Sequence, residues 1–318
     1  MRIPLRIPLA KPFDIVGFGE NSVDLLAVLA EPPAPDTKQR LQRFARMPGG
    51  QIATAMAACA RLGCRARYIG SFGDDDLGTL ARTSLLERGV DVAAARVVSG
   101  AANRFAVILV DARSGQRTVL WDCHPALTMT AADVPAAAVI SGRLLLVDDH
   151  DVPAATQAAK YARGAGVPTM IDVEHVRPGV AELLQQIDAI VAAQSFPTTL
   201  TGHEDLGRAL ATMAREFGAA LATVTLGAEG SLTWCGGREI RTSAFAVDCV
   251  DSTGAGDVFR GAFAAACLRL HTADGDLEDA LAYANAAAAL NCRALGAQSA
   301  LPTADEVARL LLSIPHRV

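Results

Sequence analysis

A glycine-rich turn near the C-terminal end carries the residues best suited to chemistry. Asp251-Ser252-Thr253-Gly254-Ala255-Gly256-Asp257 runs directly into an apolar stretch at 258–266, which predicts a helix. The first turn of a helix presents free backbone N–H groups and the positive end of the helix dipole, so it can hold an anion such as a phosphate in transfer. A carboxylate is costly beside an anion, and Asp257 therefore suggests a base that takes the proton of an attacking hydroxyl. Taken alone, Gly-x-Gly-Asp also fits a helix N-terminus capped by Asp257, because short motifs recur by chance.

The composition indicates a chain with a large core. Of 318 residues, 51% are hydrophobic and 20% charged, which suits one large domain or one domain with an appendage. A net charge of −5 gives no basic footprint for nucleic acid, and no apolar stretch reaches the ~20 residues of a membrane span. Prolines and charges interrupt residues 1–13, which predicts a frayed tail and no signal peptide.

Cysteine and histidine usage argues against metal sites and disulfide frameworks. The seven cysteines are scattered without a C-x-x-C pair, and the six histidines show no H-x-x-x-H pair. Such thiols are typical of small core residues in a reducing compartment, so we expect a cytoplasmic protein.

The elements expected to position the turn alternate between strand and helix. From residue 140 onward, apolar strands at 144–148, 169–172, 189–192 and 222–226 alternate with helices at 154–164, 178–186 and 203–217. This pattern predicts a doubly wound, mostly parallel sheet with helices on both faces. We expect a core of 14–25, 48–98 and 128–318, and β-rich inserts at 26–47 and 99–127 that form a small β-sheet lid.

Four ordered motifs resemble those of the ribokinase (PfkB-type) family of sugar kinases over nearly the whole chain. They are the Gly49-Gly50 helix ending Ala60-Arg61-Leu62-Gly63, the run 69–78 with its glycines and Asp74-Asp75, the turn 251–257, and the last helices with 284–290 and 296–298. Residues 192–197 further resemble a subgroup of ketohexokinase-like and sulfofructose-kinase-like enzymes.

The resemblance implies a ribokinase-like fold and transfer of the γ-phosphoryl group of ATP to a sugar hydroxyl. Asp257 would be the base, and the amides of Gly254, Ala255 and Gly256 would neutralise charge on the moving group. The implied substrate-binding residues are Asp24, Gly49, Gly50 and Thr54 for the sugar and, from the lid, Arg117 as a cation that clamps the γ-phosphate. The implied nucleotide-binding residues are Thr225, Gly227, Gly230, Thr253 and Asn285.

The chain also departs from the family pattern. The family's Asn-x-x-Glu, which organises water around Mg²⁺, is replaced by Ala193 and Phe196, so Asp172 or Glu174 would hold those waters instead. Ser22 and Thr54 stand where ribokinases carry asparagines that contact ribose, which favours a different or larger polyol. A K⁺ site near the backbone of Asp251 and Thr253 would leave no side-chain signature.

Two other functions stay open. A nucleoside or phosphosugar kinase would use the same fold, and a phosphosugar would need cations such as Arg104 and Arg117. A catalytically inactive sugar- or nucleotide-binding protein is supported only by the lost Asn-x-x-Glu. The expected partners are a small sugar, ATP and a second copy of the chain paired through the lid, with no nucleic acid or membrane.

Overall fold

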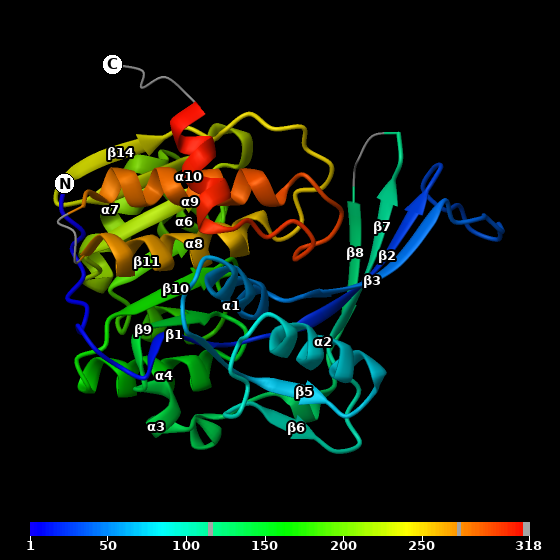
Figure 1. Cartoon of the computed structure of the whole chain (residues 1–318), viewed down its shortest axis with the longest axis horizontal. Coiled ribbons are helices and arrows are strands. Elements are labelled where there is room, and N and C mark those ends of the chain that lie inside the picture. Colours follow the sequence, from blue (N-terminus) through cyan, green and yellow to red (C-terminus); the bar gives the residue numbers. More distant parts are fainter. Residues whose placement is uncertain (114–116, 272–274, 314–318) are drawn as a thin grey trace.

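A large twisted sheet forms the centre of the molecule (Figure 1). The structure, a computed structural model, describes residues 1–113, 117–271 and 275–313. The strands run parallel from β4 to β12, and the last two are antiparallel. In sheet order they are β14 (Arg238–Thr242), β13 (Ser231–Cys235), β12 (Leu221–Thr225), β11 (Ala189–Ala192), β10 (Thr169–Val173), β9 (Gly142–Asp148), β1 (Phe13–Phe18) and β4 (Ala66–Ile69).

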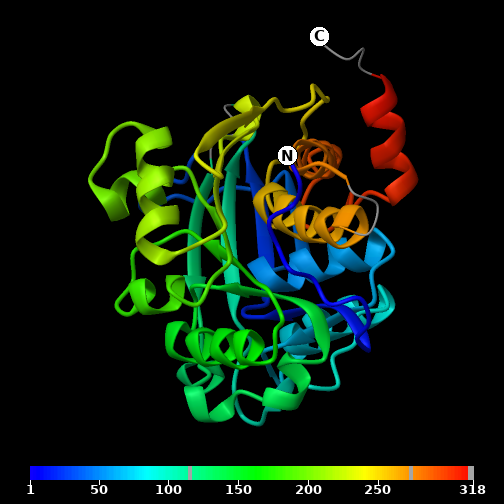
Figure 2. The same ribbon diagram turned by 90° about the vertical axis from the view of Figure 1, so that its left-hand side faces the viewer.

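Helices cover both faces of this sheet, as Figure 2 shows edge-on. The inner strands are apolar along their whole length because both of their faces are buried, and every residue of β11 is buried. One face packs against α1 (Gln51–Arg61), α8 (Ala255–Leu270), α9 (Leu277–Asn291) and α10 (Ala304–Ser313). The other packs against α3 (Ala136–Val139), α4 (Val152–Gly164), α5 (Val180–Leu184), α6 (Phe196–Thr201) and α7 (Leu206–Phe217). The predicted doubly wound architecture is confirmed.

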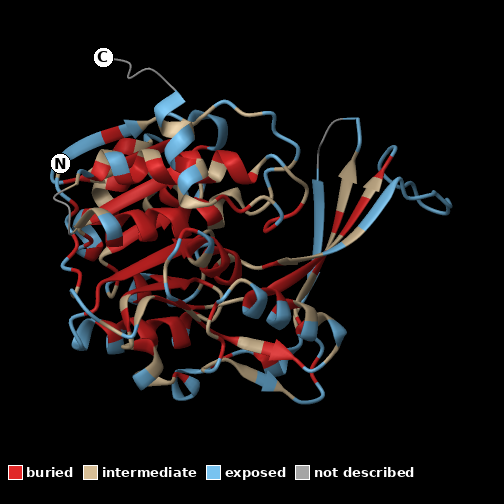
Figure 3. Cartoon of the chain, in the orientation of Figure 1, coloured by how far each residue is buried: buried red, intermediate tan, exposed pale blue. Residues whose placement is uncertain are grey.

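A second sheet of four strands rises beside the carboxyl ends of the parallel strands (Figure 1). Its order is β3 (Arg43–Gly49), β2 (Ser22–Leu29), β7 (Phe105–Asp111) and β8 (Arg117–Asp122). This lid sheet has only a small apolar cluster of its own, and all six residues of β8 are exposed (Figure 3). β5 (Ser71–Gly73) and β6 (Arg96–Val98) form a separate two-stranded sheet. The remaining elements are α2 (Asp76–Glu87) and the 3₁₀ turns Pro125–Leu127, Ala131–Asp133 and Gly227–Glu229, the last of which joins β12 to β13.

Two expected boundaries were wrong. The lid sheet begins at Ser22 rather than at residue 26, because β2 pairs with β3 and β7 from Ser22 and Val23 onward, so Asp24 belongs to the lid. The N-terminal tail is not frayed. Ile3, Leu5 and Ile7 are buried in the core, and the terminal amine lies 3.0 Å from Asp276. The alternation of apolar residues at positions 3, 5 and 7 gives one buried face, which the intervening prolines and arginines had concealed.

Candidate active site

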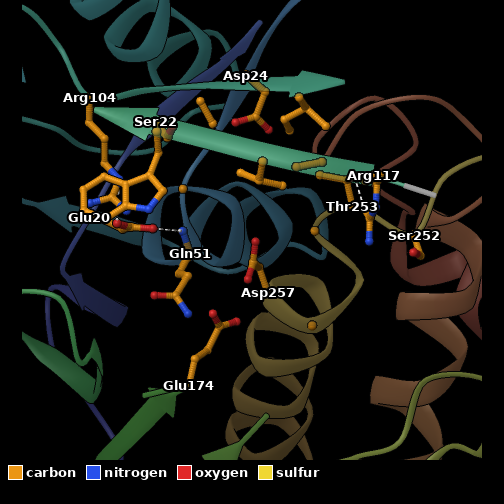
Figure 4. A pocket seen from close by; sticks show the side chains of 18 residues that line it. Glu20, Ser22, Asp24, Gln51, Arg104, Arg117, Glu174, Ser252, Thr253 and Asp257 are labelled. Carbon is orange, nitrogen blue, oxygen red and sulfur yellow. Dashed lines mark hydrogen bonds and ion pairs between the residues drawn. The ribbon is translucent and has the colours of Figure 1, made fainter. Parts of the chain in front are cut away.

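A cavity of about 510 Å³ lies between the lid sheet and the carboxyl ends of the core strands. Its acidic side chains come from four elements: Glu20 follows β1, Asp24 lies in β2, Glu174 follows β10, and Asp257 lies in the first turn of α8 (Figure 4). Ligands bind in such sheets at the carboxyl ends of the parallel strands. The fold therefore brings together residues that are more than 200 positions apart in the sequence.

The glycine turn forms one wall of this cavity through Ser252, Thr253, Gly254 and Gly256. Gly254 has φ of +75°, and a Cβ there would lie 2.6 Å from that of Ala297, so only glycine suits the position. Asp251 holds the turn in shape, since its carboxylate accepts hydrogen bonds from the amide of Thr253 at 2.9 Å and that of Gly296 at 2.8 Å. The first turn of a helix presents backbone N–H groups that suit an anion, although the amide of Ala255 already donates to the carbonyl of Ser252 at 3.2 Å.

Asp24 and Asp257 point into the cavity from opposite sides, one from the lid and one from the core (Figure 4). Burial raises the pKa of Asp257 to about 8, helped by the carboxylates of Glu174 and Glu20 and opposed by Arg260. Burial also raises the pKa of Asp24 to about 7, with the charge of Glu20 adding to the effect. A carboxyl group whose pKa lies near the working pH is suited to proton transfer.

Of the other predicted sugar-binding residues, the two glycines border Asp24 and the cavity. A Cβ on Gly49 would lie 2.7 Å from Oδ2 of Asp24, and Gly50, with φ of +89°, lines the cavity at the start of α1. Thr54 lies farther back, fully buried, where its hydroxyl accepts a hydrogen bond from Gln298 at 3.1 Å. Thr54 therefore is not part of the described cavity wall, whereas Ser22 is.

Two arginines reach the cavity from the lid side, and both are already paired. Nη1 of Arg117 donates to the hydroxyl of Thr253 at 2.5 Å and lies 3.5 Å from Asp251, so it ties β8 to the glycine turn. Nε of Arg104 lies 2.9 Å from Glu20, and its guanidinium stacks over the Trp121 ring at 4.9 Å.

The two candidates for holding metal-bound water are placed differently. Glu174 lines the cavity, but Asp172 is only 1% exposed and its Oδ1 lies 2.7 Å from Nε of Arg260. The assignment of Asp172 is corrected on this ground, because a carboxylate enclosed with its own cation does not reach a cavity-bound ion. In the described part of the chain no three His, Cys, Asp or Glu side chains are grouped to hold a metal ion. Glu174 alone still fits Mg²⁺, which is usually bound by one or two carboxylates, phosphates and water.

The predicted nucleotide-binding residues lie outside the cavity wall, except for Thr253. Thr225 ends β12, and Gly227 and Gly230 form the tight turn that follows, with φ of +56° and +93°. Asn285 of α9 donates to the hydroxyl of Ser231 at 3.0 Å, next to Gly230. The four are thus close together at the carboxyl end of a sheet strand, and their role stays a prediction.

Among the polar and aromatic side chains of the cavity wall, sequence reasoning missed Glu20, Gln51 and Trp121. Glu20 had a usable signal, since it directly follows a short apolar strand and its glycine, where ligands meet a parallel sheet. Trp121 and Gln51 had none, because no local pattern shows that this lid strand or this helix start faces the cavity.

Comparison with known proteins agrees with this geometry. A family model described as pfkB family carbohydrate kinase matches residues 13–304. The chain is 30% identical to an ATP-dependent ribose-1-phosphate kinase of Halopiger xanaduensis, over 93% of this chain and 97% of that one. It is 28% identical to a ribokinase of Bacillus subtilis, over 94% and 99%. The solved structure of Arabidopsis thaliana ribokinase complexed with ribose and ATP matches with a TM-score of 0.83 and 27% identity, over 94% and 98%.

Among the described residues, no helix has both the length and the apolar character to span a membrane. The expected family, fold and reaction class are confirmed, while the narrower ketohexokinase-like subgroup stays a prediction. The chain belongs to the pfkB family of carbohydrate kinases and is an ATP-dependent sugar kinase.

Proposed function

We propose that this kinase phosphorylates a hydroxyl of an uncharged sugar or polyol, with Asp257 as the base. The observation that carries the proposal is the placement of Asp257 in the first turn of α8, aimed into the cavity beside Gly254 and Gly256 of the glycine turn. Asp257 takes the proton from the acceptor hydroxyl, and the amides at Gly254, Ala255 and Gly256 stabilise the charge on the phosphoryl group. Such transfer depends mainly on positioning and electrostatics, which a rigid helix start supplies.

The acceptor is held between the lid and the core. Asp24 accepts hydrogen bonds from two neighbouring hydroxyl groups, and Gly49 and Gly50 allow the chain to approach the sugar. Glu174 would hold Mg²⁺ through water, and the bound ion would supply positive charge for the phosphates. Thr225, Gly227, Gly230, Thr253 and Asn285 form the nucleotide side of the site, and the backbone of Asp251 and Thr253 offers a place for K⁺.

Charge favours a neutral acceptor over a phosphosugar. A phosphosugar would need a free cation in the acceptor pocket, but Arg104 is paired with Glu20, and Arg117 contacts Thr253 and Asp251. A phosphosugar acceptor is the second candidate, because one relative is a ribose-1-phosphate kinase at 30% identity. A nucleoside is the third, and the intact turn and Asp257 weigh against an inactive binding protein.

We further propose a cytoplasmic homodimer joined through the lids. The exposed apolar side chains Phe44 and Leu120 lie on the face of the lid sheet turned away from the cavity, where a second lid would cover them. Size-exclusion chromatography with light scattering distinguishes a dimer of twice 33.1 kDa from a monomer.

The experiment that tests the proposal measures ADP release from Mg-ATP over a panel of ketoses, aldoses, polyols, nucleosides and phosphosugars. We expect turnover with an uncharged sugar and a loss of about 10²–10⁴-fold in Asp257→Asn, the usual contribution of a positioned base. Preferred turnover of a phosphosugar would establish the second candidate. Nucleotide binding by thermal shift without ADP from any acceptor would support the inactive binder.

A further inference from the structure

A buried ion pair lies directly behind the transfer site. Arg260 of α8 is 2% exposed and Asp172 at the end of β10 is 1% exposed, with 2.7 Å between Nε and Oδ1. Burying two charges costs several kcal/mol for each ion, and a well-packed apolar pair is often at least as stable. Both oxygens of Asp172 and the Nε and Nη2 atoms of Arg260 also lack a well-oriented hydrogen bond. Stability therefore does not account for the pair.

The position of the arginine is specific. Arg260 follows Asp257 by three residues, so both side chains belong to the same region of α8. Its Nη1 atom occupies the space that a Cβ on Gly256 would fill. The guanidinium thus lies against the backbone of the glycine turn at Gly256, which lines the cavity, while Arg260 itself does not.

The other charges around Asp257 are negative. Glu174 after β10, Glu20 after β1 and Asp24 of β2 all raise the pKa of Asp257, and Arg260 is the cation that opposes them. The buried carboxyls of Asp172 and Asp148 lie behind, at the ends of β10 and β9. The side chains by which the two neighbouring helices contact α8 are uncharged. From α1, the thiol of Cys59 donates a hydrogen bond to the carbonyl of Gly261. From α9, the ring of Tyr283 lies under Arg269, at the far end of α8 from Asp257.

We propose that Arg260 is a positioning residue of the kinase: clamped by Asp172, it holds a fixed positive charge behind the glycine turn and beside Asp257. This charge keeps the base ionised among its neighbouring carboxylates and adds to the field that the turn amides direct at the phosphoryl group. A cation fixed in a poorly solvated site needs no reorganisation when charge develops, which is what transition-state stabilisation requires. The inference rests on the proposed role of Asp257.

The sharpest test compares Asp172→Asn with the double variant Asp172→Asn/Arg260→Met. Both variants lack the carboxylate of Asp172, so replacing Arg260 leaves no buried carboxylate without its partner. The two variants therefore differ only in the positive charge of Arg260. We expect the double variant to lose at least about tenfold in kcat while the KM for the sugar changes by less than about threefold. In the double variant the pH below which kcat/KM declines should rise by about one unit, because the pKa of Asp257 is no longer lowered by the cation. A purely structural role of Arg260 would not change this pH.

Two further comparisons keep the test decisive if the double variant does not fold. Arg260→Lys retains the positive charge, so kcat/KM should decline below the same pH as in the wild type. Arg260→Gln removes the charge, so the decline should begin at a higher pH. Arg269→Met removes a cation farther along α8, stacked on Tyr283, and should leave the pH profile unchanged.

The inference is overturned if folded variants without the arginine show the kcat and pH profile of their matched partners. It is also overturned if wild-type turnover survives Asp257→Asn, but that result removes the proposed base itself. Loss of turnover in Asp257→Asn with no effect at Arg260 removes only the present inference.

Discussion

The contact between Gly49 and Asp24 gives a quantitative test of sugar binding. In Gly49→Ala the new Cβ would lie 2.7 Å from Oδ2 and 3.0 Å from Cγ of Asp24, against an ordinary contact of 3.4 Å or more. Gly49 is not among the glycines with positive φ, so alanine fits the backbone and the carboxylate must move by about 0.7 Å. A hydrogen bond to a charged group contributes about 1.5–3 kcal/mol, so losing one raises the KM for the sugar about 10- to 100-fold.

The assay is ADP release with the preferred acceptor titrated at saturating Mg-ATP. Because Asp24 holds the acceptor in ground state and transition state alike, KM should carry most of the change, and the KM for ATP should not move. The matched control is Gly164→Ala at the end of α4, where a Cβ meets nothing within 4 Å. A sugar KM within twofold of wild type in a folded Gly49→Ala would refute the reasoning.

Four other predictions follow from the same geometry. First, since Asp257 must be ionised to act and burial raises its pKa to about 8, kcat/KM should fall about tenfold per unit as pH drops below 8; a plateau down to pH 6 would contradict this. Second, Arg117→Ala removes the lid cation at Thr253 and should lower kcat/KM for ATP about tenfold while calorimetric sugar binding persists. Third, Glu174→Gln should raise the Mg²⁺ concentration for half-maximal activity about tenfold at fixed ATP; an unchanged Mg²⁺ titration would remove Glu174 from the metal site. Fourth, restarting the chain after residue 8 removes three buried side chains worth about 1.5–3 kcal/mol each, so the melting temperature should fall by more than about 5 °C, and an unchanged value would show that the tail is dispensable.

The fold was predictable where a local pattern has one physical meaning. Uninterrupted apolar strands separated by helices require a parallel sheet covered on both faces, and the order β9 to β12 follows from it. The glycine turn was predictable because a Gly-x-Gly-Asp run directly before an apolar helical stretch marks a helix start, and Gly254 there has φ of +75°. Features that depend on distant partners were not. Asp24 belongs to the lid because β3 and β7 pair with β2, and no local pattern in 22–29 reports that pairing.

Arg260 is the clearest case of a residue whose role the sequence conceals. In the run 258–266 it is a single cation among apolar residues, a pattern that normally places an arginine at the solvent-facing edge of a helix. Its partner Asp172 lies on a strand that reaches α8 only in the folded sheet. Asp172 was a metal candidate because it lies near the end of strand β10, and the same position brings it to Arg260. Of the two candidates, only Glu174, two residues further along the chain, reaches the cavity.

The charge balance of the cavity limits what can enter it. Glu20, Asp24, Glu174 and Asp257 face it, and the two arginines at its wall are held by Glu20 and by the glycine turn. An anionic acceptor would meet Asp24 and Asp257, whose pKa values burial raises and the negative charge of Glu20 raises further. A polyol instead donates hydroxyl hydrogens to carboxylates on both sides of the cavity, and so relieves the unfavourable burial of Asp24 from the lid and of Asp257 from the core. Closing the lid over a neutral, hydroxyl-rich molecule is therefore favourable at both carboxylates, and this is the physical reason to search for the acceptor first among uncharged sugars.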